Sequence, residues 1–214
     1  MVRLLLVNAI VLVGLLGGTL GLVRAVILRR RRGLRHLSDR LNLGVFNITK
    51  AWWKCLWAQD RLVGVYRGHE IAVEKETYRS MGRLRHREIF RLACAYPGVP
   101  EFQLVSVSPF SHFLRKRNPR IVRTGDLDFD RHFALRTQYP HFVTELLDET
   151  IRARLLDTRR EHSVNGVVRY SEGELSYAEP CLNWSSAFVD RLEVVAQRLY
   201  ELCIAVKVFT SEDE

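Results

Sequence analysis

The sequence predicts an α+β protein with an N-terminal transmembrane helix, a domain of about seven mostly antiparallel strands and a long C-terminal amphipathic helix. Three observations indicate this fold class: an uncharged N-terminal stretch, a series of short alternating segments separated by glycine turns, and a final segment with a helical period. We expect the strands to form a roll or a sandwich.

The N-terminal helix is predicted from Leu4 to Val23, a stretch without charge that only Asn8 and Thr19 interrupt. A helix of about 20 residues rises about 30 Å, the thickness of a bilayer's hydrocarbon core. Arginines follow the stretch, and positive charge tends to stay cytoplasmic, so we expect a single-pass inner (cytoplasmic) membrane protein with its N-terminus outside. Residues 1–35 would be the anchor with a basic collar, and residues 36–214 one cytosolic domain. A cleaved signal peptide is the less favoured alternative because the apolar stretch is long.

The net charge of +9, from 33 basic and 24 acidic residues, is concentrated at the N-terminus. The first 35 residues hold seven arginines and no acid, so the remainder carries a net charge of only +2. A nucleic-acid-binding domain usually has a larger basic excess, and we therefore expect no nucleic-acid partner. The collar is instead predicted to contact anionic lipid headgroups. Its members are Arg29, Arg30, Arg31, Arg32 and Arg35.

Glycines fall on one side of the predicted N-terminal helix. Gly14 and Gly18, and likewise Gly17 and Gly21, have the G-x-x-x-G spacing that lets two helix backbones approach closely. The spacing predicts a homodimer through this helix. The alternative is that glycine is simply frequent in membrane helices.

The four cysteines, Cys55, Cys94, Cys181 and Cys203, are far apart and form no C-x-x-C motif. Cys94 and Cys203 lie in apolar segments, where a free thiol behaves as a small apolar group. We expect reduced thiols in the core of a cytosolic domain.

The first half of the domain reads as a short helix followed by strands. The helix is predicted over His36 to Leu43 and precedes an aromatic-rich segment, Val45 to Trp57. Gly68 marks a hairpin turn. The predicted strands are Arg61 to Tyr66, Glu70 to Tyr78, Arg87 to Tyr96 and Glu101 to Val107.

The second half mixes short strands with two amphipathic helices. Apolar residues recur with a helical period over Phe142 to Leu156 and over Ser186 to Val206. An acidic loop is predicted at Gly125 to Asp130. The predicted strands are Ile121 to Arg123, His132 to Arg136, Gly166 to Tyr170 and Glu174 to Ala178, the last two forming a hairpin. About seven strands before one long helix also match the element order of the pleckstrin-homology roll, although the helix at 142–156 interrupts that order.

Two segments carry a resemblance to a known group of proteins. Leu62 to Val73 contains a G-x-Y-x-G-hydrophobic strand pair, and Asp128 to Leu135 precedes leucine pairs at 146–147 and 155–156. The chain thereby resembles a loose family of uncharacterised bacterial proteins with one or two N-terminal membrane spans and a cytosolic domain of unknown function. The resemblance implies a fold and brings no mechanism.

Candidate catalytic chemistry is restricted to Asp128, Asp130 and His132. A carboxylate beside an imidazole can orient a general base. The D-x-D-x-D pattern that starts at Asp126 fails as a calcium loop, because Arg131 and Thr137 replace the required glycine and glutamate. No nucleophile, phosphate or zinc motif accompanies these residues, and we expect no metal or cofactor.

A tryptophan cluster, Trp52, Trp53 and Trp57, has two interpretations, a place in the core or a place on lipid headgroups. Taken together, the sequence favours a membrane-anchored binding or scaffold module that contacts a protein partner or the membrane surface. The alternative is a membrane-tethered enzyme with an Asp/His site assembled by folding.

Overall fold

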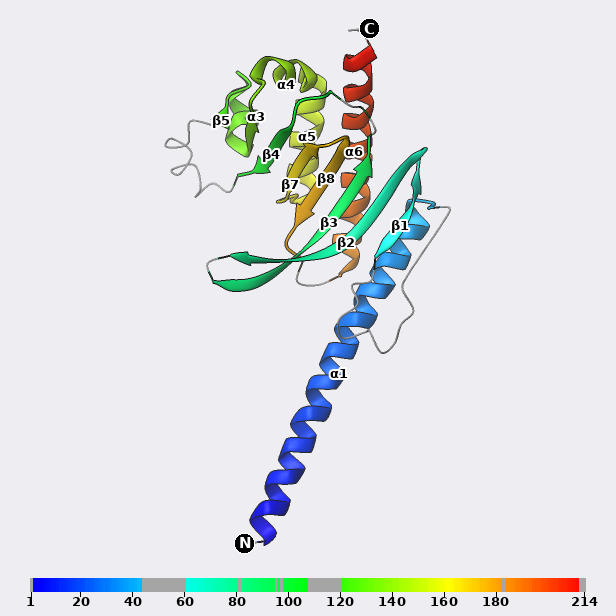
Figure 1. The fold of residues 1–214 in the computed structure, drawn as a ribbon, viewed down its shortest axis with the longest axis vertical. Coiled ribbons are helices and arrows are strands. Elements are labelled where there is room, and N and C mark those ends of the chain that lie inside the picture. The colour runs from blue at the N-terminus through cyan, green and yellow to red at the C-terminus, as the bar shows by residue number, and fades with distance from the viewer. Residues whose placement is uncertain are drawn as a thin grey trace.

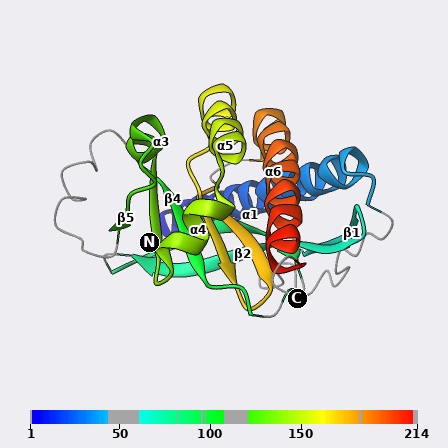
Figure 2. The ribbon, with the colours of Figure 1, turned by 90° about the horizontal axis from the view of Figure 1, so that it is seen from above.

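The computed structural model describes residues 2–43, 61–80, 82–94, 96, 98–107, 121–181 and 184–211, and it shows one sheet with helices packed against one face (Figures 1 and 2). The helices are α1 Val2–Arg40, α3 Leu127–His132, α4 Pro140–Leu146, α5 Glu149–His162 and α6 Ser186–Ser211. The strands are β1 Leu62–Tyr66, β2 His69–Ser80, β3 Arg83–Ala93, β4 Phe102–Ser106, β5 Ile121–Val122, β6 Phe133–Thr137, β7 Val167–Ser171 and β8 Glu174–Glu179.

The sheet has eight strands in the order β1-β2-β3-β8-β7-β4-β6-β5, and every neighbouring pair is antiparallel. The hairpin β7-β8 lies between β3 and β4, so these two strands, which follow one another in the sequence, are not neighbours in the sheet. The sheet therefore has two open edges, β1 and β5, among the described strands.

Two tight turns fix the register of the hairpins β1-β2 and β7-β8. Arg67 and Gly68 have φ values of 50° and 87°, and Glu172 and Gly173 have values of 54° and 75°. Two consecutive residues with positive φ define the type I′ turn, whose twist matches that of the flanking strands. Both hairpins predicted from the sequence are confirmed.

The core lies between the sheet and the helix layer. Side chains of α6 that recur every three or four residues pack on apolar residues of the central strands. The α6 residues include Phe188, Leu192, Val195, Leu199, Leu202 and Val206, and the sheet residues include Phe90, Leu92, Leu104, Leu135, Tyr170, Leu175 and Tyr177.

The last turns of α1 belong to this core, because Leu34, Leu37 and Leu41 are buried. The helix therefore continues through residue 35, where the sequence suggested a domain boundary. Gly33 lies so close to Trp184 that an added Cβ would come within 2.4 Å of the indole ring. The close approach of α1 to Trp184 thus requires a residue without a side chain at position 33.

A buried ion pair also holds α1. The Nε and Nη2 atoms of Arg30 donate to the two carboxylate oxygens of Glu88 on β3, at 2.9 and 2.8 Å. The indole nitrogen of Trp184 donates to the same carboxylate at 3.2 Å. Both Arg30 and Glu88 are less than a tenth exposed. A bidentate guanidinium–carboxylate pair with a further donor offsets much of the cost of burying the charges.

The predicted transmembrane helix is wrong: among the residues that the structure describes, no helix combines the length and the apolar composition of a membrane span. The structure shows one continuous helix from Val2 to Arg40, in which the arginines expected after a span share a helix with the apolar residues. The inner-membrane location with the N-terminus outside, which was inferred from that span, is wrong for the same reason.

Other elements also differ from the prediction. The predicted roll or sandwich is wrong. The eight described strands form one sheet that begins at β1 and ends at β5, and the described helices that contact it lie on one face. The helix expected over His36 to Leu43 is the end of α1, and the helix expected over 142–156 is two helices because Asp148 caps a new one. The predicted acidic loop contains α3, which Asp126 caps by accepting from the N–H groups of Asp128 and Phe129.

We predict that Gly33→Ala destabilises the protein. The new methyl group would overlap the ring of Trp184, so α1 must shift, and overpacking of this kind costs about 1–3 kcal/mol of the free energy of unfolding. Gly21→Ala in the same helix is the matched control, because nothing lies within 4 Å of its added Cβ. Urea denaturation should show a loss for Gly33→Ala alone. Equal stability of the two variants would contradict the packing of α1 on Trp184.

Candidate functional site

The face of the sheet opposite the described helices carries an ordered row of polar side chains. Cross-strand partners form one line across all eight strands, from Val63 on β1 to Ile121 on β5. The five central members of the row are Arg91, Ser176, Arg169, Gln103 and Arg136, on β3, β8, β7, β4 and β6. Because adjacent strands lie about 4.8 Å apart, the three arginines are spaced by about 10 Å.

Strand alternation explains why these residues reach the open face. Gln103 precedes buried Leu104, Arg169 precedes buried Tyr170, and Arg136 follows buried Leu135. Successive side chains of a strand point to opposite faces, so the residue beside each core residue faces away from the helices. The polar row and the apolar core are therefore formed by neighbouring residues of the same strands, on opposite faces of the sheet.

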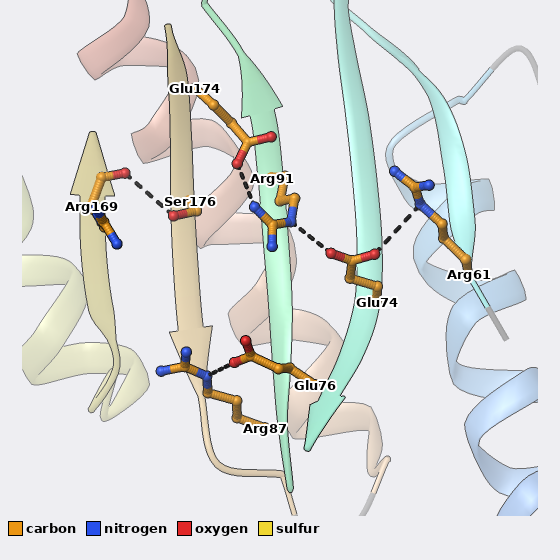
Figure 3. Close-up of polar contacts among 8 residues, drawn as sticks. All are labelled: Arg61, Glu74, Glu76, Arg87, Arg91, Arg169, Glu174 and Ser176. Carbon is orange, nitrogen blue, oxygen red and sulfur yellow. Dashed lines mark hydrogen bonds and ion pairs between the residues drawn. The ribbon is translucent and has the colours of Figure 1, made fainter. Parts of the chain in front are cut away.

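Figure 3 shows that the charges at the β1-β2-β3-β8 end of the face neutralise one another. The guanidinium of Arg91 donates to Glu74 at 2.7 Å and to Glu174 at 2.6 Å. Arg61 extends this chain, 3.6 Å from Glu74, and Arg87 pairs with Glu76. Partial burial works against the charge of Arg91, but the hydrogen bonds to Glu174 and Glu74 outweigh it and raise the pKa of Arg91. These groups are therefore paired within the protein.

The other end of the face is hollowed. A cavity of about 700 Å³ lies over β4, β6 and β7, and a second one of about 390 Å³ adjoins it at Arg169. The larger cavity is lined by Glu101, Phe102, Gln103, Arg136, Thr137, Gln138, Tyr139 and Arg169. Its volume is within the range of small-ligand sites.

Most charged groups at this cavity already have partners. The carboxylate of Glu101 accepts from Ser171 Oγ at 2.6 Å and lies 3.6 Å from Arg169. Arg136 differs: it is exposed, and in the described part of the chain its guanidinium makes no ion pair and no hydrogen bond. Gln103 and Gln138 add amide groups, and Tyr139 adds a ring that is 57% exposed. A free guanidinium beside amides can bind a carboxylate or a phosphate.

The predicted Asp/His site is only partly assembled. Asp128 and His132 lie one turn apart on α3, with Nδ1 of His132 2.9 Å from the backbone oxygen of Asp128 and 3.5 Å from its carboxylate. The other carboxylate oxygen of Asp128 accepts from Arg160 at 2.6 Å. Asp130 instead accepts from the backbone N–H and the hydroxyl of Thr124, both at 3.1 Å. Asp128 therefore links α3 to α5 through Arg160, and Asp130 links α3 to Thr124.

A second pair of carboxylates, Glu88 and Glu179, lies side by side on the buried face as cross-strand partners. Burial raises the pKa of the Glu179 carboxyl, against the hydrogen bond from Tyr177 and the charge of Arg191. Raised carboxyl pKa values occur in catalytic acids. Here Oε2 of Glu179 accepts from the hydroxyl of Tyr177 at 2.7 Å and from Nε of Arg191 at 3.2 Å, which indicates a structural role.

The arginine collar and the glycines lie along α1. Arg30 is buried in its pair with Glu88, Arg31 is half-buried, and Arg29, Arg32 and Arg35 are exposed. Nothing lies within 4 Å of an added Cβ at Gly17, Gly18 or Gly21, and this part of α1 projects from the sheet (Figure 1). The surroundings of Gly14 lie outside the described residues. The homodimer through this helix and the lipid contacts of the arginines stay predictions.

Other predicted features have these positions. Cys94 and Cys203 are buried, and Cys181 is half-buried. Cys55 and the cluster of Trp52, Trp53 and Trp57 lie outside the described residues. Within the residues that the structure places, no three His, Cys, Asp or Glu side chains are grouped as a metal site.

Comparison with known proteins adds no relative: no family model matches the chain, and the search of curated proteins finds no match.

Sequence reasoning missed Arg136 and Gln103. The alternation of β4 and β6 already assigns both to the polar face, but it does not reveal which strands are neighbours. Their meeting depends on the pairing of β4 with both β6 and β7, which joins segments far apart in the sequence.

We predict that Asp130 stabilises the fold and that Asp128 contributes little. Asp130→Ala removes the acceptor of two donors on Thr124, which is 9% exposed, and should lower the free energy of unfolding by about 1–3 kcal/mol. Asp128→Ala loses only exposed ion pairs, worth about 0–1 kcal/mol. Urea denaturation of both variants tests the difference. A larger loss for Asp128→Ala would contradict these roles.

Proposed function

We propose that this protein is a binding module and that the cavity over β4, β6 and β7 receives an acidic side chain of a protein partner. The observation that supports this proposal is Arg136, an exposed guanidinium without a partner in the described part of the chain, at the rim of a cavity of about 700 Å³.

The rest of the open face supports a site limited to that cavity. Arg61, Arg87 and Arg91 are ion-paired within the sheet, so a ligand that bound them would have to displace a carboxylate. Arg136 carries no such cost. A carboxylate would accept two parallel N–H groups from the guanidinium, and the amides of Gln103 and Gln138 line the same space.

A peptide is favoured over a small molecule because the cavity opens on a sheet face. The neighbouring depression at Arg169 and Ser176 continues in the same direction as the row of polar residues. An acidic side chain would occupy the cavity while the flanking residues of the partner lie along that row. Interfaces of this kind are polar at the rim and obtain specificity from a few paired charges.

We predict that Arg136→Gln weakens binding of a glutamate-containing peptide. The probe is a fluorescein-labelled peptide of Ser and Gly with three glutamates, and the reference peptide has glutamines at those positions. Fluorescence polarisation with the full chain should show binding of the glutamate peptide alone, weakened about tenfold or more by Arg136→Gln, since a hydrogen bond to a charged group contributes about 1.5–3 kcal/mol.

Arg87→Gln is the matched control, because Arg87 lies on the same face but pairs with Glu76 outside the cavity. It should leave the affinity unchanged. Equal affinity of the two peptides, or equal loss in the two variants, would overturn the proposal. Thermal unfolding of both variants shows whether a loss of binding follows from a loss of fold.

A further inference from the structure

The hairpin of β2 and β3 extends beyond the rest of the sheet as a two-stranded arm, residues 75–87 (Figure 1). β1 pairs with β2 only as far as Val73, and β8 pairs with β3 only from Glu88 onward. No described strand therefore lies beside the arm on either side. The β2 residues from Lys75 to Ser80 give it a length of about 20 Å.

The arm is strongly basic. Residues 75–87 contain five basic residues and one acidic residue, a net charge of +4. The chain from residue 36 onward has a net charge of only +2, so without the arm this part of the chain would be acidic. The expectation of no nucleic-acid partner was based on the charge of the whole domain, which conceals this local excess.

Three arginines near the tip of the arm are available to a ligand. Arg79, Arg83 and Arg85 are exposed, and none of them makes an ion pair or a hydrogen bond within the part of the chain that the structure describes. Arg87 differs, because it pairs with Glu76 on the opposite strand. The charge at the base of the arm is thus neutralised, and the charge toward its tip is not.

The free charges lie on both faces of the arm. Arg83 and Arg85 alternate in step with Arg91, so they point to the face away from the helices, and they are about 6.8 Å apart along β3. Arg79 is the cross-strand partner of Leu84 and points to the opposite face. A planar anionic surface would contact only one of these faces. A ligand with negative charge on two sides can contact both.

We propose that the arm enters the major groove of duplex DNA, where the three free arginines bind phosphates on the two walls of the groove. The major groove of B-form DNA is about 12 Å wide and admits a two-stranded β-ribbon. Leu84 is 67% exposed between the arginines and can contact the methyl group of thymine, which lies in this groove. The major groove of duplex RNA is too deep and narrow for such an arm.

Fluorescence anisotropy of a fluorescein-labelled DNA duplex of about 20 base pairs, titrated with the full chain at about 50 to about 200 mM potassium chloride, tests the proposal. Arg83→Gln/Arg85→Gln should weaken binding about tenfold or more and lower the slope of log affinity against log salt by about 2, because two phosphate contacts are lost. Both side chains are exposed, so the Tm should not change.

Arg123→Gln/Arg131→Gln is the matched control, because it removes the same charge at two exposed arginines outside the arm. It should leave the DNA affinity within about twofold of wild type, since it removes none of the proposed phosphate contacts. Equal losses in the two variants would overturn the proposal, because the attraction would then be one of net charge alone.

Two further ligands separate the groove from other anionic surfaces. An RNA duplex of the same sequence should bind more weakly than the DNA duplex, and equal affinity would contradict docking in the major groove. Vesicles of phosphatidylcholine and phosphatidylserine test a lipid surface. Vesicle binding that Arg83→Gln/Arg85→Gln abolishes, with DNA affinity unchanged in the same variant, would overturn the proposal in favour of a lipid ligand.

Discussion

The architecture depends on one constraint: the sheet buries a single face. All described helices that touch it lie on the same side, so the central strands place apolar residues on that side and the polar row from Arg91 to Arg136 on the other (Figure 2). The core and the polar row are two consequences of this one arrangement. Leu104 beside Gln103 and Tyr170 beside Arg169 show it at single positions. No described helix covers the row on the other face, where the cavity over β4, β6 and β7 lies.

Charge is used differently on the two faces. Arg30 and Glu88 are paired in the dry interface beneath α1, where breaking the pair would leave a charge in a poorly solvated place. The pairs around Arg91 and Glu74 lie in contact with water and contribute little to stability. Their effect is to make most of the open face neutral. Arg136 is the exception at the cavity, because its guanidinium has no partner in the described part of the chain.

Local features of the fold were predictable from the sequence, and long-range ones were not. Glycine turns at 68 and 173 and the apolar period of α6 identified two hairpins and the C-terminal helix, because each depends on neighbouring residues. The break at Leu147 was missed because the apolar period continues across it while Asp148 caps a new helix. The apolar N-terminal stretch predicted a span that the structure does not support. The cavity could not be predicted from the sequence, because it depends on which strands are neighbours in the sheet.

The proposed function depends on ligand binding at Arg136 on the open face. Arginine Nε–Hε correlations in NMR spectra of the full chain, recorded while the glutamate peptide is added, test it residue by residue. The signals of Arg136 and, more weakly, Arg169 should shift with a single saturation curve while that of Arg87 stays in place. Shifts confined to arginines of α1, or none in the sheet, would contradict it.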